Sequence, residues 1–216
     1  MNAKPIDIIV VDDHQLVRAG LRQTLGNEPD LRIQRECQTG REALEALHSH
    51  PCNVLLLDLS LPDMSGLEVL AQAREKHATV AVLVISGFPE TQFGINVLRA
   101  GASGYVSKTV DTAELVRAVR RVAGGRRYVG PELADLLVNG IDGSGEGPRH
   151  ASLSEREFQV FCRLAKGDAP GVIARQLGLS VKTVSTYRTR VLEKMGFKTN
   201  ADLTAYALQN ELMPSR

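Results

Sequence analysis

Carboxylate, hydroxyl and ammonium groups follow short apolar runs in the first half of the chain. Asp12 and Asp13 come directly after one such run, Asp58 follows a second, and Ser86 and Lys108 follow two more. Three carboxylates that meet in one place repel one another and need a counter-charge, which Mg²⁺ supplies because it prefers oxygen ligands. With that charge in place, a carboxylate can stay ionised and attack a phosphoryl donor. The pattern therefore predicts phosphoryl chemistry.

Asp58 is the residue that we expect to accept the phosphoryl group. The resulting acyl phosphate adds nearly two negative charges, which draw Lys108 and Ser86 towards it. Movement of Ser86 leaves space into which Tyr105 can rotate, so a two-state element is predicted. Taken alone, an Asp or a Ser after a strand usually caps a turn, and a Lys there is usually solvated. A capping role would not explain why Asp, Ser and Lys residues follow so many successive strands. Together these residues therefore favour a role in phosphoryl transfer.

Five apolar runs in this region alternate with longer amphipathic stretches. The runs predict strands at Ile6–Val11, Leu31–Cys37, Val54–Leu57, Val80–Ile85 and Gly104–Ser107. The stretches predict helices at Gln15–Leu25, Gly40–His48, Gly66–Lys76, within Glu90–Ala100, and at Asp111–Val122. Because near-continuous apolar strands need cover on both faces, we expect an α/β fold with a flavodoxin-like, doubly wound, five-stranded parallel sheet. The carboxyl ends of its strands, where such sheets bind ligands, then bring the three carboxylates together.

The remainder of the chain has a purely helical pattern. Pro131–Val138 predicts one short helix, and the glycine-rich stretch 139–149 predicts a flexible linker. Beyond it we expect four helices, with N-caps at Ser154, Ser180 and Asn200, namely Ser154–Ala165, Pro170–Leu177, Ser180–Met195 and Asn200–Leu208. The link at Gly178 is typical of a helix-turn-helix. The predicted domains are residues 1–125 (α/β), 126–150 (short helix and linker) and 151–216 (a small all-α domain).

Charge is distributed unevenly along the chain. Residues 1–148 hold 15 Lys and Arg against 19 Asp and Glu, a net −4, whereas residues 149–216 hold 11 against 6, a net +5. A basic C-terminal part behind an acidic N-terminal part favours a polyanionic partner for the C-terminal domain.

The overall composition is that of an ordinary globular protein, with 43% hydrophobic and 24% charged residues. No apolar run is long enough to cross a membrane, and the N-terminus lacks the apolar core of a signal peptide, so we expect a cytoplasmic protein without a membrane partner. Cys37, Cys52 and Cys162 are odd in number and scattered, which predicts reduced, packed thiols. The five histidines, His14 included, show no metal-ligand spacing and are expected to be ordinary.

Four segments resemble the receiver domains of two-component response regulators. They are Asp12-Asp13, residues 58–66 (DLSLPDMSG), Val84-Ile85-Ser86 and residues 101–108 (GASGYVSK). The resemblance implies that Asp58 takes phosphate from a sensor histidine kinase or phosphotransfer protein. It implies that Asp13, Asp58 and the Ser60 carbonyl bind Mg²⁺, with Asp12 assisting through water. Ser86 and Tyr105 match the switch pair of the family.

Residues 153–207 resemble the LuxR-type helix-turn-helix of the NarL/FixJ response regulators. The resemblance is carried by residues 153–157 (LSERE), 165–167 (AKG), 173–177 (IARQL), 180–184 (SVKTV) and 192–196 (LEKMG). It implies double-stranded DNA as partner and a homodimer through the last helix. In the second helix of the motif we expect an inward stripe of Val181, Val184, Val191, Leu192 and Met195. The candidate DNA contacts are Lys182, Thr183, Ser185, Thr186, Arg188, Thr189, Arg190 and Lys194.

Two other interpretations remain open at this point. A haloacid-dehalogenase-like phosphatase also phosphorylates an Asp in an α/β fold, but it needs a second Asp two residues after the nucleophile, where this chain has Ser60. A receiver-like scaffold that no longer takes phosphate is the third interpretation, and the intact set of acidic residues with Lys108 disfavours it. The leading expectation is a phosphorylation-controlled transcription factor that binds DNA half-sites as a dimer and catalyses only its own Mg²⁺-dependent phosphorylation and dephosphorylation.

Overall fold

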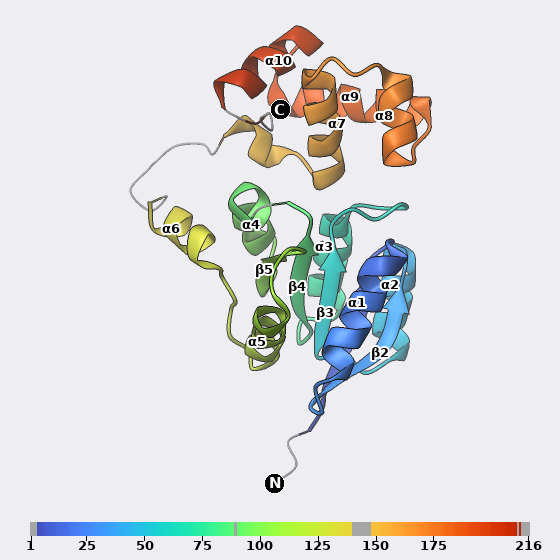
Figure 1. The fold of residues 1–216 in the computed structure, drawn as a ribbon, viewed down its shortest axis with the longest axis vertical. Coiled ribbons are helices and arrows are strands. Elements are labelled where there is room, and N and C mark those ends of the chain that lie inside the picture. The colour runs from blue at the N-terminus through green and yellow to red at the C-terminus, as the bar shows by residue number, and fades with distance from the viewer. Residues whose placement is uncertain (1–3, 89, 140–147, 211, 213–216) are drawn as a thin grey trace. The chain divides into compact units, whose positions relative to one another are not determined.

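The computed structural model describes residues 4–88, 90–139, 148–210 and 212. The chain divides into two compact units, Met1–Ser144 and Gly145–Arg216. Figure 1 shows an α/β unit and an all-helical unit, as the sequence predicts. Most of the expected glycine-rich linker, residues 140–147, lies outside the described residues.

The N-terminal unit is built on a five-stranded, all-parallel sheet with the strand order β2-β1-β3-β4-β5. The strands are β1 (Ile6–Val11), β2 (Leu31–Cys37), β3 (Val54–Asp58), β4 (Ala81–Ser86) and β5 (Gly104–Ser107). Every residue of β3 is buried because both of its faces are covered, which explains its uninterrupted apolar sequence. This order is the flavodoxin-like one that the sequence predicts.

Five helices cover the two faces of the sheet (Figure 1). Helices α1 (Gln15–Gly26) and α5 (Thr112–Ala123) lie on one face, where Leu21, Leu25 and Val119 pack on alternate residues of the strands. Helices α2 (Gly40–Ser49), α3 (Gly66–Lys76) and α4 (Glu90–Arg99) lie on the other. All five hold the strands so that their carboxyl ends meet at one edge of the sheet.

Local capping begins several of these helices where the sequence predicts. Asp111 accepts the N–H of Glu114 at 2.7 Å, which confirms the expected start of α5. Thr39 and Ser65 cap α2 and α3 in the same way. After α5 the chain forms α6 (Pro131–Asn139), which packs on α4. Segment 126–139 is therefore part of the N-terminal unit.

The C-terminal unit contains a short 3-10 helix, η1 (Arg149–Ser152), followed by α7 (Glu155–Ala165), α8 (Pro170–Leu177), α9 (Val181–Met195) and α10 (Asn200–Gln209). Ser154 and Glu157 form the predicted capping box, and Gly178 takes the left-handed conformation (φ 65°) in the turn between α8 and α9. One predicted cap is wrong: Thr199, not Asn200, caps α10, because its hydroxyl and the Asp202 carboxylate bind each other's backbone N–H groups.

The expected inward stripe of α9 is wrong at one position. Val184, Val191, Leu192 and Met195 are buried, but Val181 is 52% exposed. Val181 is the first residue of α9 and lies outside the buried part of the stripe.

The three cysteines are free thiols, as predicted. Burial raises the pKa of the thiols to about 11 at Cys37 and Cys162 and to about 12 at Cys52, so they stay protonated near neutral pH. In the part of the chain that the structure describes, none of the helices has the length and apolar character that crossing a membrane requires.

Candidate functional site

The carboxyl ends of β1, β3 and β5 bring two carboxylates and an ammonium group into contact. Nζ of Lys108 lies 2.7 Å from Oδ2 of Asp58 and 2.7 Å from Oδ2 of Asp12. Both aspartates are fully buried. One ammonium thus balances two carboxylates that follow neighbouring strands, which is the convergence that the sequence predicts.

Asp13 and His14 complete an acidic cluster around this ion pair. Ligand atoms of Asp12, Asp13, His14 and Asp58 all lie within 4.8 Å of one another. His14 is a correction to the sequence analysis, which treats it as ordinary: its Nδ1 lies 2.7 Å from Oδ1 of Asp13 and 3.2 Å from Oδ1 of Asp12. A group of three carboxylates fits the oxygen preference of Mg²⁺.

Close backbone packing positions Asp58. A Cβ atom on Gly66, the first residue of α3, would lie 2.5 Å from the Asp58 carbonyl oxygen and 2.5 Å from Cα of Leu59. Only glycine lets α3 begin directly against the loop that follows β3. Within that loop the backbone N–H of Ser60 donates to Oδ1 of Asp58 at 3.2 Å, which orients the carboxylate.

Ser86 and Tyr105, the expected switch pair, bind the same residue of the loop after β4. Oγ of Ser86 accepts the backbone N–H of Phe88 at 3.1 Å, and the Tyr105 hydroxyl donates to the Phe88 carbonyl at 2.8 Å. Both side chains are fully buried. Sequence reasoning did not single out Phe88, because its part in this site depends on a backbone group that any residue carries.

Burial and charge act in opposite directions on the central ion pair. Burial raises the pKa of the Asp58 carboxyl, the Lys108 ammonium opposes that shift, and the Asp12 carboxylate adds to it, so that the pKa lies above its usual value. Burial alone would lower the pKa of Lys108, but the carboxylates of Asp58 and Asp12 outweigh it and hold the pKa above its usual value. Lys108 is therefore charged while ionisation of Asp58 costs stability.

Replacing Asp58 with Asn should stabilise the metal-free protein at neutral pH by about 1–3 kcal/mol. A raised pKa in the folded state means that ionisation of Asp58 weakens folding as the pH rises through that pKa, and Asn removes this effect. The free energy of unfolding of both proteins can be measured by urea denaturation at several pH values, with a chelator present to remove metal ions. The explanation fails if the Asp58→Asn variant is no more stable than wild type at neutral pH, or if its advantage grows as the pH falls.

In the C-terminal unit, α9 presents most of the predicted DNA contacts to solvent. Lys182, Ser185, Thr186, Thr189 and Arg190 are exposed, and Thr183 is half-buried. Each of the hydroxyls of Ser185, Thr186 and Thr189 donates to the carbonyl four residues earlier. Their oxygen lone pairs remain as acceptors, so in this conformation they suit donors on the major-groove edges of cytosine and adenine.

Two predicted DNA contacts instead join helices. Nε of Arg188 donates to the Asn200 side chain at 2.8 Å, which connects α9 with α10. Nζ of Lys194 lies 2.7 Å from Oε2 of Glu157, the buried carboxylate of the α7 capping box. Both partners are distant in sequence, so the helical pattern of α9 could not indicate them.

Lys194→Ala should lower the stability of the C-terminal unit by about 1 kcal/mol, because the buried Glu157 carboxylate loses its ammonium partner. The loss should be small because Lys194 is half-exposed, so that solvent weakens the ion pair in the wild type. Hydrogen exchange of the α7 and α9 amides in the full chain measures the loss, with the exposed Lys166→Ala as control. A DNA-binding salt slope that falls by about 1 with unchanged exchange would instead assign Lys194 to a phosphate contact.

Comparison with known proteins adds to this geometry. Residues 8–120 match the response regulator receiver domain, and residues 151–207 match the bacterial regulatory proteins of the luxR family. The chain is 34% identical over 208 residues to the response regulator UvrY of Escherichia coli, with 96% of this chain and 95% of that protein covered. It is 40% identical over 198 residues to the transcriptional regulatory protein UhpA of Salmonella typhimurium, with 92% and 95% covered. A structure of the RcsB response regulator of Salmonella typhimurium superposes on this chain with a TM-score of 0.60 at 22% sequence identity. The match covers 96% of this chain and 100% of the RcsB chain, and it supports the fold.

The fold, the acidic cluster and these similarities define a two-domain regulator of transcription with a receiver and a DNA-binding module. The chain belongs to the response regulators of two-component systems, in the NarL/FixJ family whose DNA-binding domain is of the LuxR type.

Proposed function

We propose that Asp58 accepts a phosphoryl group from a sensor histidine kinase or a phosphotransfer protein. The observation that carries this proposal is the contact of Lys108 with both Asp58 and Asp12, 2.7 Å each, beside the carboxylate of Asp13. These groups supply a nucleophile, an electrophilic cation and an acidic set for a hard metal ion at one place.

The transfer exchanges one bond to phosphorus for another. An Oδ atom of Asp58 attacks the phosphorus, the bond between phosphorus and the donor's imidazole nitrogen breaks, and its electron pair stays on that nitrogen. Asp12, Asp13 and Asp58, with the Ser60 carbonyl, would hold Mg²⁺, whose charge would neutralise oxygens of the transferring group. Lys108 then turns from the carboxylate pair to the new phosphoryl oxygens, and the Ser86 hydroxyl, whose oxygen accepts the Phe88 N–H, donates its own hydrogen to them.

The C-terminal unit binds double-stranded DNA in this proposal, through the exposed side chains of α9. The unit dimerises through α10, whose Leu208 is 63% exposed, and a two-fold dimer would match paired half-sites. Such a partner places the protein in the cytoplasm. Chemistry is confined to Asp58 itself, namely its own phosphorylation and dephosphorylation, since Ser60 stands where a haloacid-dehalogenase-like phosphatase needs its second Asp.

DNA affinity measured before and after treatment with acetyl phosphate and Mg²⁺ tests the whole proposal. Wild type should bind a half-site-containing promoter fragment about tenfold or more tightly after treatment, and Asp58→Ala should show no change, because the coupling energy of such switches is about 1–3 kcal/mol. Equal gains in both proteins would contradict control through Asp58.

A further inference from the structure

His14 is held against the acidic cluster by its own backbone. It directly precedes α1, and its backbone N–H donates to Oδ1 of Asp12 at 2.7 Å. Although His14 is the N-cap residue of α1, its side chain makes no capping hydrogen bond. Its Nδ1 lies instead 2.7 Å from Oδ1 of Asp13 and 3.2 Å from Oδ1 of Asp12. The imidazole is therefore directed at the carboxylates and is not used to begin the helix.

The distances within the cluster suit ligands of a single ion. One ligand atom from each of Asp12, Asp13, His14 and Asp58 lies within 4.8 Å of the others. Two ligands on opposite sides of a small divalent ion lie about 4.0–4.4 Å apart, because each bond to the metal is about 2.0–2.2 Å long. Small movements of the side chains would bring all four groups to these distances. Three carboxylates and one imidazole thus form a mixed set of oxygen and nitrogen donors.

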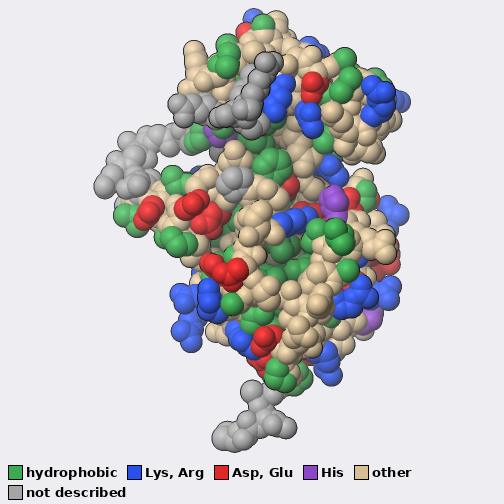
Figure 2. Space-filling view, in the orientation of Figure 1, with side chains coloured by type: hydrophobic (Ala, Val, Ile, Leu, Met, Phe, Trp, Pro, Cys, Tyr) green, Lys and Arg blue, Asp and Glu red, His purple; other side chains and the backbone are tan. Residues whose placement is uncertain are grey.

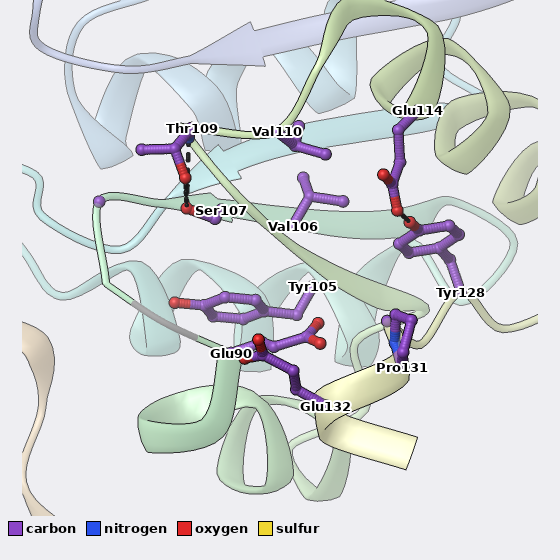
Figure 3. A pocket seen from close by; sticks show the side chains of 12 residues that line it. Glu90, Tyr105, Val106, Ser107, Thr109, Val110, Glu114, Tyr128, Pro131 and Glu132 are labelled. Atoms are coloured by element: carbon purple, nitrogen blue, oxygen red, sulfur yellow. Dashed lines mark hydrogen bonds between the residues drawn. The ribbon is translucent and has the colours of Figure 1, made fainter. Parts of the chain in front are cut away.

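Lys108 contacts other atoms of the same cluster. Its Nζ lies 2.7 Å from Oδ2 of both Asp12 and Asp58, whereas the imidazole contacts Oδ1 atoms. The residues on either side of Lys108 bind each other, which fixes its backbone (Figure 3). The hydroxyls of Ser107 and Thr109 lie 2.7 Å apart, and the Thr109 N–H donates to Oγ of Ser107 at 3.2 Å. The ammonium and the imidazole therefore do not compete for the same carboxylate oxygens.

The exposure of the imidazole lets its Nδ1 act as a ligand. The His14 side chain is 60% exposed, while Asp12 and Asp58 are fully buried. A neutral imidazole carries one hydrogen, and Nδ1 has a free electron pair when that hydrogen is on Nε2. A ring in contact with water can exchange the hydrogen between its nitrogens through solvent. Nδ1 can therefore bind a cation at the place where it now meets the Asp13 carboxylate.

We propose that His14 is a metal ligand of the acidic cluster and raises the preference of this site for first-row transition ions such as Co²⁺ over Mg²⁺. Mg²⁺ binds oxygen ligands, whereas an imidazole nitrogen favours the later transition ions. The imidazole therefore strengthens the binding of Co²⁺ and adds little to the binding of Mg²⁺. The ion that is bound beside Asp58 thus depends on His14 as well as on the three aspartates. This inference rests on the metal site of the proposed function.

Calorimetric titration of the tag-free full chain with Co²⁺ and with Mg²⁺ tests the role of His14. His14→Ala should lower the affinity for Co²⁺ about tenfold or more, because even the loss of a group that only orients a ligand costs about 10–100-fold. Its affinity for Mg²⁺ should change about twofold or less, since Mg²⁺ selects oxygen. The substitution should leave α1 intact because the imidazole does not cap it. His50→Ala removes a histidine outside the cluster and should bind both ions as wild type does.

Visible absorption of the bound Co²⁺ is the second readout, because a nitrogen ligand changes the energies of its d–d bands. The Co²⁺ spectrum of His14→Ala should differ from that of wild type, and the spectrum of His50→Ala should not. An unchanged spectrum in His14→Ala, or a Co²⁺ affinity within about twofold of wild type, overturns the inference and leaves His14 as an ion-pair partner of Asp13.

Asp13→Asn separates this failure from a failure of the proposed function. It removes a carboxylate of the cluster and should weaken the binding of both ions. If wild type binds Mg²⁺ and loses it in Asp13→Asn while His14→Ala keeps the Co²⁺ affinity, only the role of His14 is wrong. If wild type binds neither ion, the metal site of the proposed function is wrong, and the inference is overturned with it.

Discussion

Asp58→Ala should keep its unmodified mass after incubation with acetyl phosphate and Mg²⁺, whereas wild type should gain about 80 Da, the mass of one phosphoryl group. Asp58 is the carboxylate that Lys108 contacts at the end of β3, with Asp12 and Asp13 beside it. Attack on phosphorus needs an ionised carboxylate and a positive charge close to the oxygens of the phosphoryl group. These residues bring both to the Asp58 carboxylate. Intact-protein mass spectrometry measures the result.

Three further samples make this experiment specific. Asp135→Ala removes an exposed aspartate of α6 and should gain the same mass as wild type. Lys108→Ala keeps the nucleophile but should slow phosphorylation by about 10²-fold, the effect of losing one preorganised electrostatic contact. Chelation of divalent cations should abolish the gain, because the acidic cluster then lacks its neutralising charge. An equal mass gain in Asp58→Ala would show that another residue is the acceptor.

The double variant Lys182→Ala/Arg190→Ala should weaken DNA binding about tenfold near physiological salt and reduce the slope of log K against log salt by about 2, since each lost phosphate contact contributes about 0.9. Both side chains are exposed on α9, the second helix of the helix-turn-helix, and neither has an ion-pair partner among the described residues. Fluorescence anisotropy with a labelled duplex at several salt concentrations provides both quantities.

Matched variants separate charge from helix position. Lys166→Ala removes an exposed cation beyond the end of α7 and should leave the slope unchanged. Arg188→Ala should lower DNA affinity because it removes the contact with Asn200 that fixes α9 against α10. The salt slope of this variant should change less than that of the double variant. If the double variant keeps the wild-type slope, α9 is not the DNA-contacting helix. Lys and Arg side chains appear on both units in Figure 2. The salt slope is therefore measured for each variant, because basic composition alone does not identify the helix that contacts DNA.

Much of this protein could be predicted from local sequence patterns. The apolar runs and the caps at Asp111, Ser154 and Ser180 place the helices and strands within a few residues, because capping and periodicity depend on neighbours along the chain. The meeting of Asp12 and Asp58 was also predictable, since strands of a doubly wound sheet end at one edge.

Contacts between distant elements were decided only by the tertiary structure. The sequence did not indicate the place of His14 in the acidic cluster, the joint hold of Ser86 and Tyr105 on Phe88, or the seat of α6 on α4. Each of these depends on how far one element is rotated about its axis against another, which side-chain packing sets and local periodicity does not record.

The basic residues of α9 have two candidate roles, contact with DNA and contact with neighbouring helices. Their number and helical spacing follow from the sequence, and so does their suitability for DNA. Which of them remain free for DNA was decided by packing, because Lys194 is drawn to a carboxylate of α7 and Arg188 to the start of α10. By itself the sequence determined the family of this regulator and predicted its chemistry, and the tertiary structure decided which side chains are already engaged in holding it together.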